Sequence, residues 1–223
     1  MIKAVVFDLD DTLISEKQYV KSGFREVSKF ISNKYNLNQE EVFNIMLQIF
    51  EESSKDVFNR VLNNFRIEYA KEEILCLIKI YREHIPEIEF FDDVIPTLNK
   101  LRSKGIKIGI ITDGYKETQS RKLEVLKCYE LFDEIIMTDE LGREFWKPHE
   151  KAYRLIAEKL GVNLNEMIYI GDNISKDFIS ANKLRIMSVC INRHYGIYKN
   201  IEVNEEYLAM NNIESLEEIE VLV

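Results

Sequence analysis

Short runs rich in valine and isoleucine alternate with helical patterns along most of this chain, and this alternation is the feature that most constrains its fold. Strands that alternate with helices are typical of a parallel sheet with helices on both faces. The runs predict strands at 2–7, 106–111, 134–137, 167–170 and 186–191. The helical patterns lie at 93–103, 115–127, 148–160 and 175–183. We therefore expect an α/β fold with a doubly wound parallel sheet.

A stretch of different character separates the first predicted strand from the second. It contains no glycine between Gly23 and Gly105, and its apolar residues recur at the spacing of one helix face. The first such face is spaced by four, three and four residues: Val20, Phe24, Val27 and Ile31. Three similar faces follow. We predict a small all-helical domain over 15–90, inserted into an α/β domain made of 1–14 and 91–223. Ligands of open α/β sheets bind beyond the carboxyl ends of the strands, so an insert that leaves from this end could cover the site as a lid.

The composition excludes several classes of function. The 39 Asp and Glu residues outnumber the 30 Lys and Arg residues, and the formal net charge is -9. Binding to nucleic acid rests on clustered cations, so no nucleic-acid partner is expected. No apolar run approaches the roughly 18 residues that a membrane span requires, and three widely spaced cysteines suggest neither disulfides nor zinc. We expect a cytoplasmic protein without a membrane partner, either a monomer or a homodimer.

Acidic and hydroxyl side chains gather at the ends of the predicted strands. They are Asp8, Asp10 and Thr12 after the first strand, Thr112 and Asp113 after the second, and Asp172 and Asp177 after the fourth. A single aspartate at such a position is usually a helix cap or a turn former. Several close carboxylates, however, repel one another and stay ionised only with a cation among them, and oxygen ligands suit magnesium. The set therefore predicts a magnesium site at one edge of the sheet.

The same residues carry a resemblance to a known family. The run Asp8-Leu9-Asp10-Asp11-Thr12 resembles the DxDxT signature of the haloacid dehalogenase superfamily. Three further motifs appear in the family's order: the second is similar to 110–114, the third to Lys147-Pro148, and the fourth to 171–177. The resemblance implies a Rossmann-like core, and the helical insert resembles the cap of one large branch of the family.

This resemblance implies a Mg²⁺-dependent phosphomonoester hydrolase that acts on a small phosphorylated metabolite, such as a sugar phosphate, a nucleotide or a phospho-acid. Asp8 would attack phosphorus and form an aspartyl-phosphate, and Asp10 would act as general acid and base. The metal ion would be held by the side chains of Asp8 and Asp172 and by the backbone carbonyl of Asp10. Asp10 also favours phosphate esters over halides, because a halide leaving group needs no proton.

The resemblance also implies how the phosphate is bound. The Thr112 hydroxyl, the Lys147 ammonium and backbone amides around Leu9 and Asp113 would contact the phosphoryl oxygens. Asp177 would orient Lys147 or hold a metal-bound water. Asn173 would contact the residues that bind the metal ion, not the ion itself.

Three neighbouring positions receive less direct expectations. Pro148 is expected to begin a helix and so to direct the preceding lysine toward the strand ends. Asp11 is expected to have a structural role such as capping. Trp146 either stacks on a ring of the leaving group or packs against the neighbouring helix.

Two alternatives remain open from the residues alone. A phosphomutase would use the same side chains but return the phosphoryl group to its substrate, and a requirement for a bisphosphate activator would reveal it. A catalytically silent module that binds a phosphorylated partner is disfavoured by the intact set of Asp8, Asp10, Thr112, Lys147 and Asp172. The natural substrate is beyond reach of the sequence.

Overall fold

The computed structural model describes residues 1–193 and 203–223, and it divides the chain into two compact units. The larger unit contains Met1–Glu16 and Ile88–Val223, and the smaller one contains Lys17–Glu87. These divisions lie close to the boundaries expected at 14–15 and 90–91. That the smaller unit serves as a cap domain stays a prediction.

Within the described residues, a parallel sheet of six strands forms the centre of the larger unit, in the order β3-β2-β1-β4-β5-β6. The strands are β1 (Ala4–Phe7), β2 (Lys107–Thr112), β3 (Glu134–Met137), β4 (Met167–Gly171), β5 (Met187–Ile191) and β6 (Asn211–Ile213). Because β1 lies between β2 and β4, the strand order reverses at β1, and ligands of such sheets bind at this point. The predicted α/β fold with a doubly wound parallel sheet is confirmed. The strand β6 was not predicted, since its three residues include only one apolar side chain.

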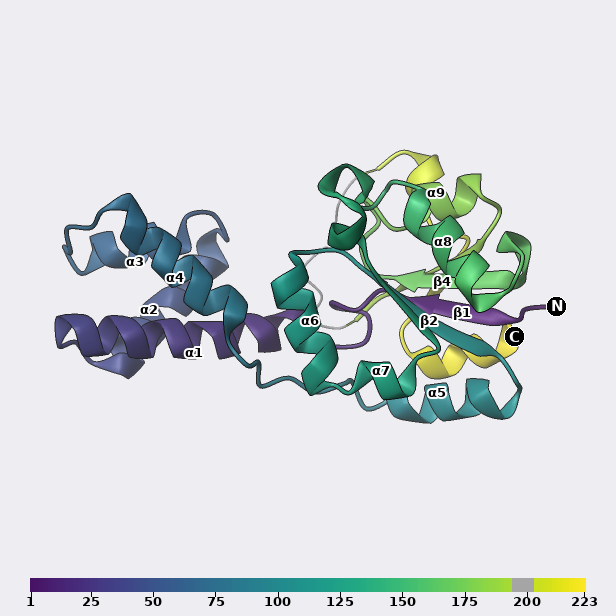
Figure 1. Ribbon diagram of the computed structural model, residues 1–223, viewed down its shortest axis with the longest axis horizontal. Helices are drawn as coiled ribbons and strands as arrows, with labels where there is room; N and C mark the ends of the chain where they lie inside the picture. Colours follow the sequence, from purple (N-terminus) through teal and green to yellow (C-terminus); the bar gives the residue numbers. More distant parts are fainter. Residues whose placement is uncertain (194–202) are drawn as a thin grey trace. The chain divides into compact units, whose positions relative to one another are not determined.

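Alternate side chains of β1 enter two hydrophobic cores, one on each face of the sheet. Val5 and Phe7 pack with α5 (Val94–Ser103), α6 (Lys116–Val125), α7 (Cys128–Leu131) and the 3-10 helix Leu216–Val221. Ala4 and Val6 pack with α8 (Lys151–Leu160) and α9 (Phe178–Lys183). Figure 1 shows α5 on one side of the sheet and α8 and α9 on the other. Burial on both faces explains why the strands appear in the sequence as nearly continuous apolar runs.

The smaller unit consists of helices packed around a core of their own. Its helices are α1 (Glu16–Tyr35), α2 (Gln39–Glu52), α3 (Val57–Asn64) and α4 (Lys71–Glu83). The face of α1 predicted to be apolar is buried in this core along its whole length. Gly23 is needed where α1 meets α4, because a Cβ atom there would lie 2.5 Å from the Tyr81 ring.

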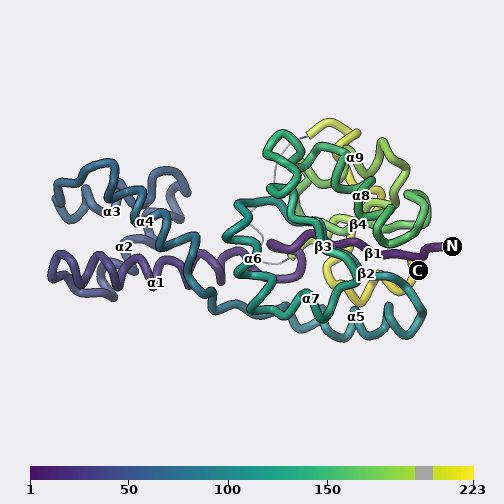
Figure 2. The backbone as a smooth tube through the Cα atoms, in the orientation of Figure 1, coloured from purple at the N-terminus to yellow at the C-terminus, as the bar shows by residue number. Residues whose placement is uncertain are grey.

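The two ends of the chain lie at the same end of the larger unit (Figure 2), where Ile2 and Val223 pack against the same core. Further short 3-10 helices lie at Thr138–Leu141, Arg143–Phe145, Leu164–Glu166 and Glu205–Tyr207. Throughout residues 1–193 and 203–223, no helix combines the length and the apolar character that a bilayer span requires.

Candidate active site

Asp8 lies directly after β1, at the carboxyl end of the central part of the sheet. Its backbone N–H donates to the Ile170 carbonyl oxygen of β4 at 2.8 Å, which fixes the start of the loop. The side chain is buried, and its Oδ1 accepts a hydrogen bond from Nζ of Lys147 at 2.5 Å. Burial raises the pKa of Asp8 to about 6, although the positive charge of Lys147 opposes the shift. A carboxylate therefore faces a buried ammonium group at the end of β1.

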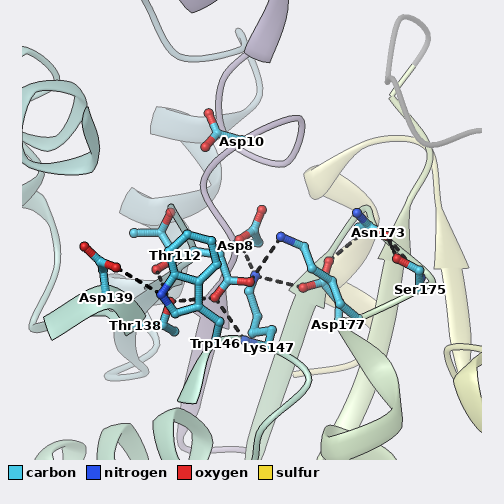
Figure 3. Close-up of polar contacts among 12 residues, drawn as sticks. Asp8, Asp10, Thr112, Thr138, Asp139, Trp146, Lys147, Asn173, Ser175 and Asp177 are labelled. Atoms are coloured by element: carbon cyan, nitrogen blue, oxygen red, sulfur yellow. Dashed lines mark hydrogen bonds and ion pairs between the residues drawn. The ribbon is translucent and has the colours of Figure 1, made fainter. Parts of the chain in front are cut away.

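Lys147 joins the carboxylates of two different motifs (Figure 3). Besides Asp8, its Nζ contacts Asp177 Oδ1 at 2.8 Å and the Tyr169 hydroxyl at 3.0 Å, and its side chain has no exposed surface. Burial alone would lower the pKa of Lys147, but the negative charges of Asp177 and Asp8 hold this pKa well above its usual value. The lysine is thus a permanent positive charge, which could screen an incoming anion.

Asp8, Asp172 and Asp177 form a group of carboxylates that could hold a metal ion. One oxygen of each lies within 4.8 Å of the others. Burial raises the pKa of Asp172 to about 9, and the charges of Asp177 and Asp8 add to the shift. A divalent cation among these oxygens would offset both burial and repulsion, and carboxylate oxygens are the ligands that Mg²⁺ prefers. The donor set therefore fits a magnesium ion.

The Asp10 side chain lies apart from these three carboxylates, as Figure 3 shows. It contacts α6 instead. Nζ of Lys122 lies 2.6 and 2.8 Å from the two Asp10 oxygens, and the Gln119 amide nitrogen donates to Oδ2 at 3.0 Å. The expected metal ligand at this position is the backbone carbonyl oxygen of Asp10, and that contribution stays a prediction.

Sequence reasoning missed both α6 residues. Positions 119 and 122 lie on the same face of the helix as Leu123 and Leu126. These two leucines pack in the core on the face of the sheet that α5 covers. Gln119 and Lys122 are buried as well. A lysine and a glutamine on the buried stripe of a helix were the available signal.

Thr112 and Asp113 end β2 beside the carboxylate group. The Thr112 hydroxyl is buried and accepts a hydrogen bond from the Gln119 side chain. Asp113 Oδ1 accepts from the Thr138 hydroxyl at 2.6 Å and from the Lys147 backbone N–H at 3.1 Å. The use of the Asp113 amide and of the Thr112 hydroxyl to bind phosphate stays a prediction, while the Asp113 side chain holds the backbone of Lys147.

Lys176 is a second cation at this edge and was not singled out from the sequence. Its Nζ forms an ion pair with Asp113 Oδ2 at 3.2 Å. Burial opposes the charged form of Asp113, but the charges of Lys147 and Lys176 prevail, so the pKa of Asp113 is lowered. Two positive charges therefore stand among the carboxylates of the site.

The loop after β4 is shaped by its own side chains. Asp177 Oδ2 accepts the Asn173 backbone N–H at 2.9 Å, and Asn173 Oδ1 accepts the Ser175 backbone N–H at 3.0 Å. Gly171 allows this closure, because a Cβ atom there would lie 2.5 Å from Asp177 Oδ2. Asp177 therefore contacts both the Lys147 ammonium and the Asn173 backbone. That Asp177 orients the lysine and that Asn173 supports the ligands stay predictions.

Leu9 and Asp11 flank Asp10 in the loop after β1. The Leu9 side chain is fully buried in the core, and the use of its amide to bind phosphate stays a prediction. Asp11 has a φ of +50°, in the left-handed region that aspartate tolerates better than most residues. Its Oδ1 accepts the backbone N–H of Glu16, the first residue of α1, at 2.9 Å. This contact is of the capping kind expected for Asp11.

The segment around Pro148 differs from the expectation. Pro148 lies in a turn, and α8 begins at Lys151, so the proline does not start the helix. The preceding lysine is directed instead by its contacts with carboxylates. Trp146 packs edge to face against Tyr115, just before α6, and its Nε1–H donates to Asp139 at 3.2 Å. Stacking of Trp146 on a leaving group stays a prediction.

Comparison with known families places these motifs in context. A family model described as "Haloacid dehalogenase-like hydrolase" matches residues 5–191, which include all four motifs. The chain belongs to the haloacid dehalogenase-like hydrolases.

Relatives in this family narrow the class of activity. A glyceraldehyde 3-phosphate phosphatase of Methanocaldococcus jannaschii is 30% identical over 98% of this chain and 97% of its own length. The pyrophosphatase PpaX of Bacillus mycoides is 30% identical over 77% of this chain and 75% of its own. A crystal structure of a haloacid dehalogenase-like phosphatase from Thermococcus onnurineus superposes with a TM-score of 0.64 at 28% identity, over 99% of this chain and 98% of that one. This haloacid dehalogenase-like protein is a hydrolase of the phosphatase class.

Proposed function

We propose that this protein is a Mg²⁺-dependent phosphomonoester hydrolase that acts on a small phosphorylated metabolite through an aspartyl-phosphate on Asp8. The observation that carries the proposal is the contact between Asp8 and Lys147 beside the carboxylates of Asp172 and Asp177. This arrangement joins a nucleophile, a positive charge and a donor set for magnesium at the point where the strand order reverses.

In the proposed first step, an Asp8 oxygen forms a bond to phosphorus as the bond from phosphorus to the ester oxygen breaks. The Lys147 ammonium reduces the repulsion between the Asp8 carboxylate and the phosphate group, and the Thr112 hydroxyl donates to a phosphoryl oxygen. Asp10 gives its proton to the departing alkoxide, which leaves as an alcohol. Magnesium, when bound by Asp8, Asp172 and the Asp10 carbonyl, supplies further positive charge for the phosphoryl group.

In the proposed second step, water attacks the phosphorus of the aspartyl-phosphate. Asp10, now a carboxylate, takes a proton from this water and returns to its starting form. The bond to Asp8 breaks, inorganic phosphate leaves, and the nucleophile is regenerated. The two steps divide one difficult displacement into two easier ones.

The acidic group gives a prediction for metal binding that does not depend on activity. The pKa of Asp172 is raised to about 9 in the folded protein, well above its ordinary value. At pH 8 the ionised carboxylate of the unfolded chain must therefore take up a proton on folding, which opposes folding of the metal-free protein. Asp172→Asn should therefore raise the melting temperature in EDTA at pH 8. In the wild-type protein, Mg²⁺ at 100 times its dissociation constant should raise the melting temperature by about 5–10 °C.

The Asp172→Asn variant should lose most of this Mg²⁺-dependent shift. Calorimetry with and without Mg²⁺ measures both effects, and Glu158→Gln, which removes an exposed acid from α8, serves as the matched control. A full Mg²⁺-dependent shift in Asp172→Asn would show that the ion binds elsewhere.

We further propose that the substrate is a short sugar phosphate. The M. jannaschii relative, which matches this chain over nearly its whole length, is named for glyceraldehyde 3-phosphate, whereas the shorter match is to a pyrophosphatase. In a panel with Mg²⁺, we expect kcat/KM for glyceraldehyde 3-phosphate to exceed that for pyrophosphate and nucleoside monophosphates by tenfold or more, a difference of about 1.4 kcal/mol. A preference for pyrophosphate would replace the proposed substrate class, and activity that needs a bisphosphate activator would indicate a mutase. A cytoplasmic location stays a prediction.

A further inference from the structure

The carboxylate of Asp10 is held by two donors that the haloacid dehalogenase motifs do not include. Lys122 contacts both carboxylate oxygens and Gln119 contacts one, and the two donors lie three residues apart on one face of α6. Gln119 also donates to the Thr112 hydroxyl. Gln119 thus links Asp10, the expected general acid, to Thr112, which is expected to bind the phosphate.

Stability alone gives no reason for a lysine at this position. The Lys122 side chain is 4% exposed, on a stripe that elsewhere carries the apolar residues Leu123 and Leu126. Burying an ion pair costs desolvation of both charges, and apolar residues of similar size are often at least as stabilising. The pair with Asp10 therefore points to a role in what Asp10 does.

The contacts define the orientation of the Asp10 carboxylate. An ionised carboxylate offers about four acceptor positions on its two oxygens. Among the hydrogen bonds of residues 1–193 and 203–223, two of these positions accept from Lys122 and one from Gln119. Two of the three lie on Oδ2, so Oδ1 keeps a position for the transferred proton. Without these donors the carboxylate could rotate, and proton transfer requires donor and acceptor within hydrogen-bonding reach.

We infer that Lys122 and Gln119 are positioning residues that orient Asp10 for proton transfer to the leaving oxygen of a phosphate ester. This inference rests on the proposed function, in which Asp10 is the general acid. It goes further because it assigns a function to the buried face of α6. The dependence of rate on the leaving group separates it from a structural role, since a poor leaving group needs the proton and a good one does not.

The test compares Lys122→Met with the wild type on glyceraldehyde 3-phosphate and on p-nitrophenyl phosphate. General acid catalysis contributes about 10²–10⁴ in rate, so we expect kcat/KM for the sugar phosphate to fall by about tenfold or more and for the aryl phosphate by less than about twofold. The ratio kcat/KM is chosen because it excludes hydrolysis of the intermediate, a step shared by all substrates. Arg121→Met, which removes an exposed arginine from the same helix, should leave both values unchanged.

Two further variants keep the inference open to contradiction. Lys122→Gln retains a donor without the charge. If Lys122→Met does not fold, the same comparison of kcat/KM on the sugar phosphate and on the aryl phosphate is made with Lys122→Gln. In an Asp10→Asn background, Lys122→Met should have little additional effect on the sugar phosphate, because both changes remove the same proton transfer. Equal losses on both substrates, or additive losses in the double variant, would overturn the inference. A wild type with no phosphatase activity would instead contradict the proposed function.

Discussion

Replacement of Asp8 by asparagine should abolish turnover and leave the fold intact. The two side chains have nearly the same shape, but the amide cannot attack phosphorus, so kcat should fall by roughly 10⁴–10⁶, as for loss of other enzymic nucleophiles. Folding should survive because Lys147 keeps its contact with Asp177 at 2.8 Å. The change also removes a carboxylate whose pKa is raised to about 6 by burial, so the metal-free variant should be no less stable than the wild type near neutral pH.

Steady-state rates and rapid-quench labelling check this expectation together. The wild type should show a phosphorylated protein during turnover, and Asp8→Asn should show none. Asp11→Asn is the matched control from the same loop, because asparagine also tolerates the positive φ and can still accept the Glu16 N–H. Wild-type turnover by Asp8→Asn would exclude Asp8 as the nucleophile.

The parts of the fold that could be predicted are those in which local pattern and burial agree. The strand β1 is buried on both faces, so all four of its residues must be apolar: Ala4, Val5, Val6 and Phe7. This apolar run predicts the strand from the sequence alone. The last strand, β6, has the sequence Asn-Asn-Ile and depends on pairing with β5. Such a strand arises from tertiary contacts, and three residues are too few for a periodic pattern to predict it.

The beginnings of helices show the same limit. Pro148 is well suited to the first position of a helix, yet α8 begins at Lys151. The two residues between them, His149 and Glu150, lie outside the helix, while the Lys147 side chain reaches Asp8 and Asp177. Contacts between distant parts of the chain here outweigh a local preference.

For the site, the sequence motifs supplied the strand-end residues but not their neighbours. Asp8, Lys147 and Asp177 come from three motifs, and the structure brings them into contact. Gln119 and Lys122 belong to no motif, and their partner Asp10 is more than a hundred residues away. Only the packing of α6 against the sheet reveals that these side chains meet.

Replacement of Lys147 by methionine should cost both stability and activity. Methionine fills a similar volume, but it leaves Asp8 and Asp177 buried, close together and without the cation that now contacts both. Removing one partner of a buried ion pair destabilises a protein by roughly 3–5 kcal/mol. For a chain of this size, the melting temperature in EDTA should therefore fall by roughly 6–20 °C. Turnover should be lost as well, because no ammonium group screens the approach of Asp8 to phosphate.

Calorimetry of a set of three variants separates charge from packing in this effect. Lys159→Met removes a lysine that pairs with Glu134 at the surface, and it should change stability by less than about 1 kcal/mol. Adding Asp177→Asn to Lys147→Met removes one of the two uncompensated carboxylates, so it should recover part of the lost stability without recovering turnover. A Lys147→Met protein as stable as the wild type would mean that the carboxylates are neutral in the folded state. In that case Lys147 would not be the cation that keeps Asp8 ionised for attack.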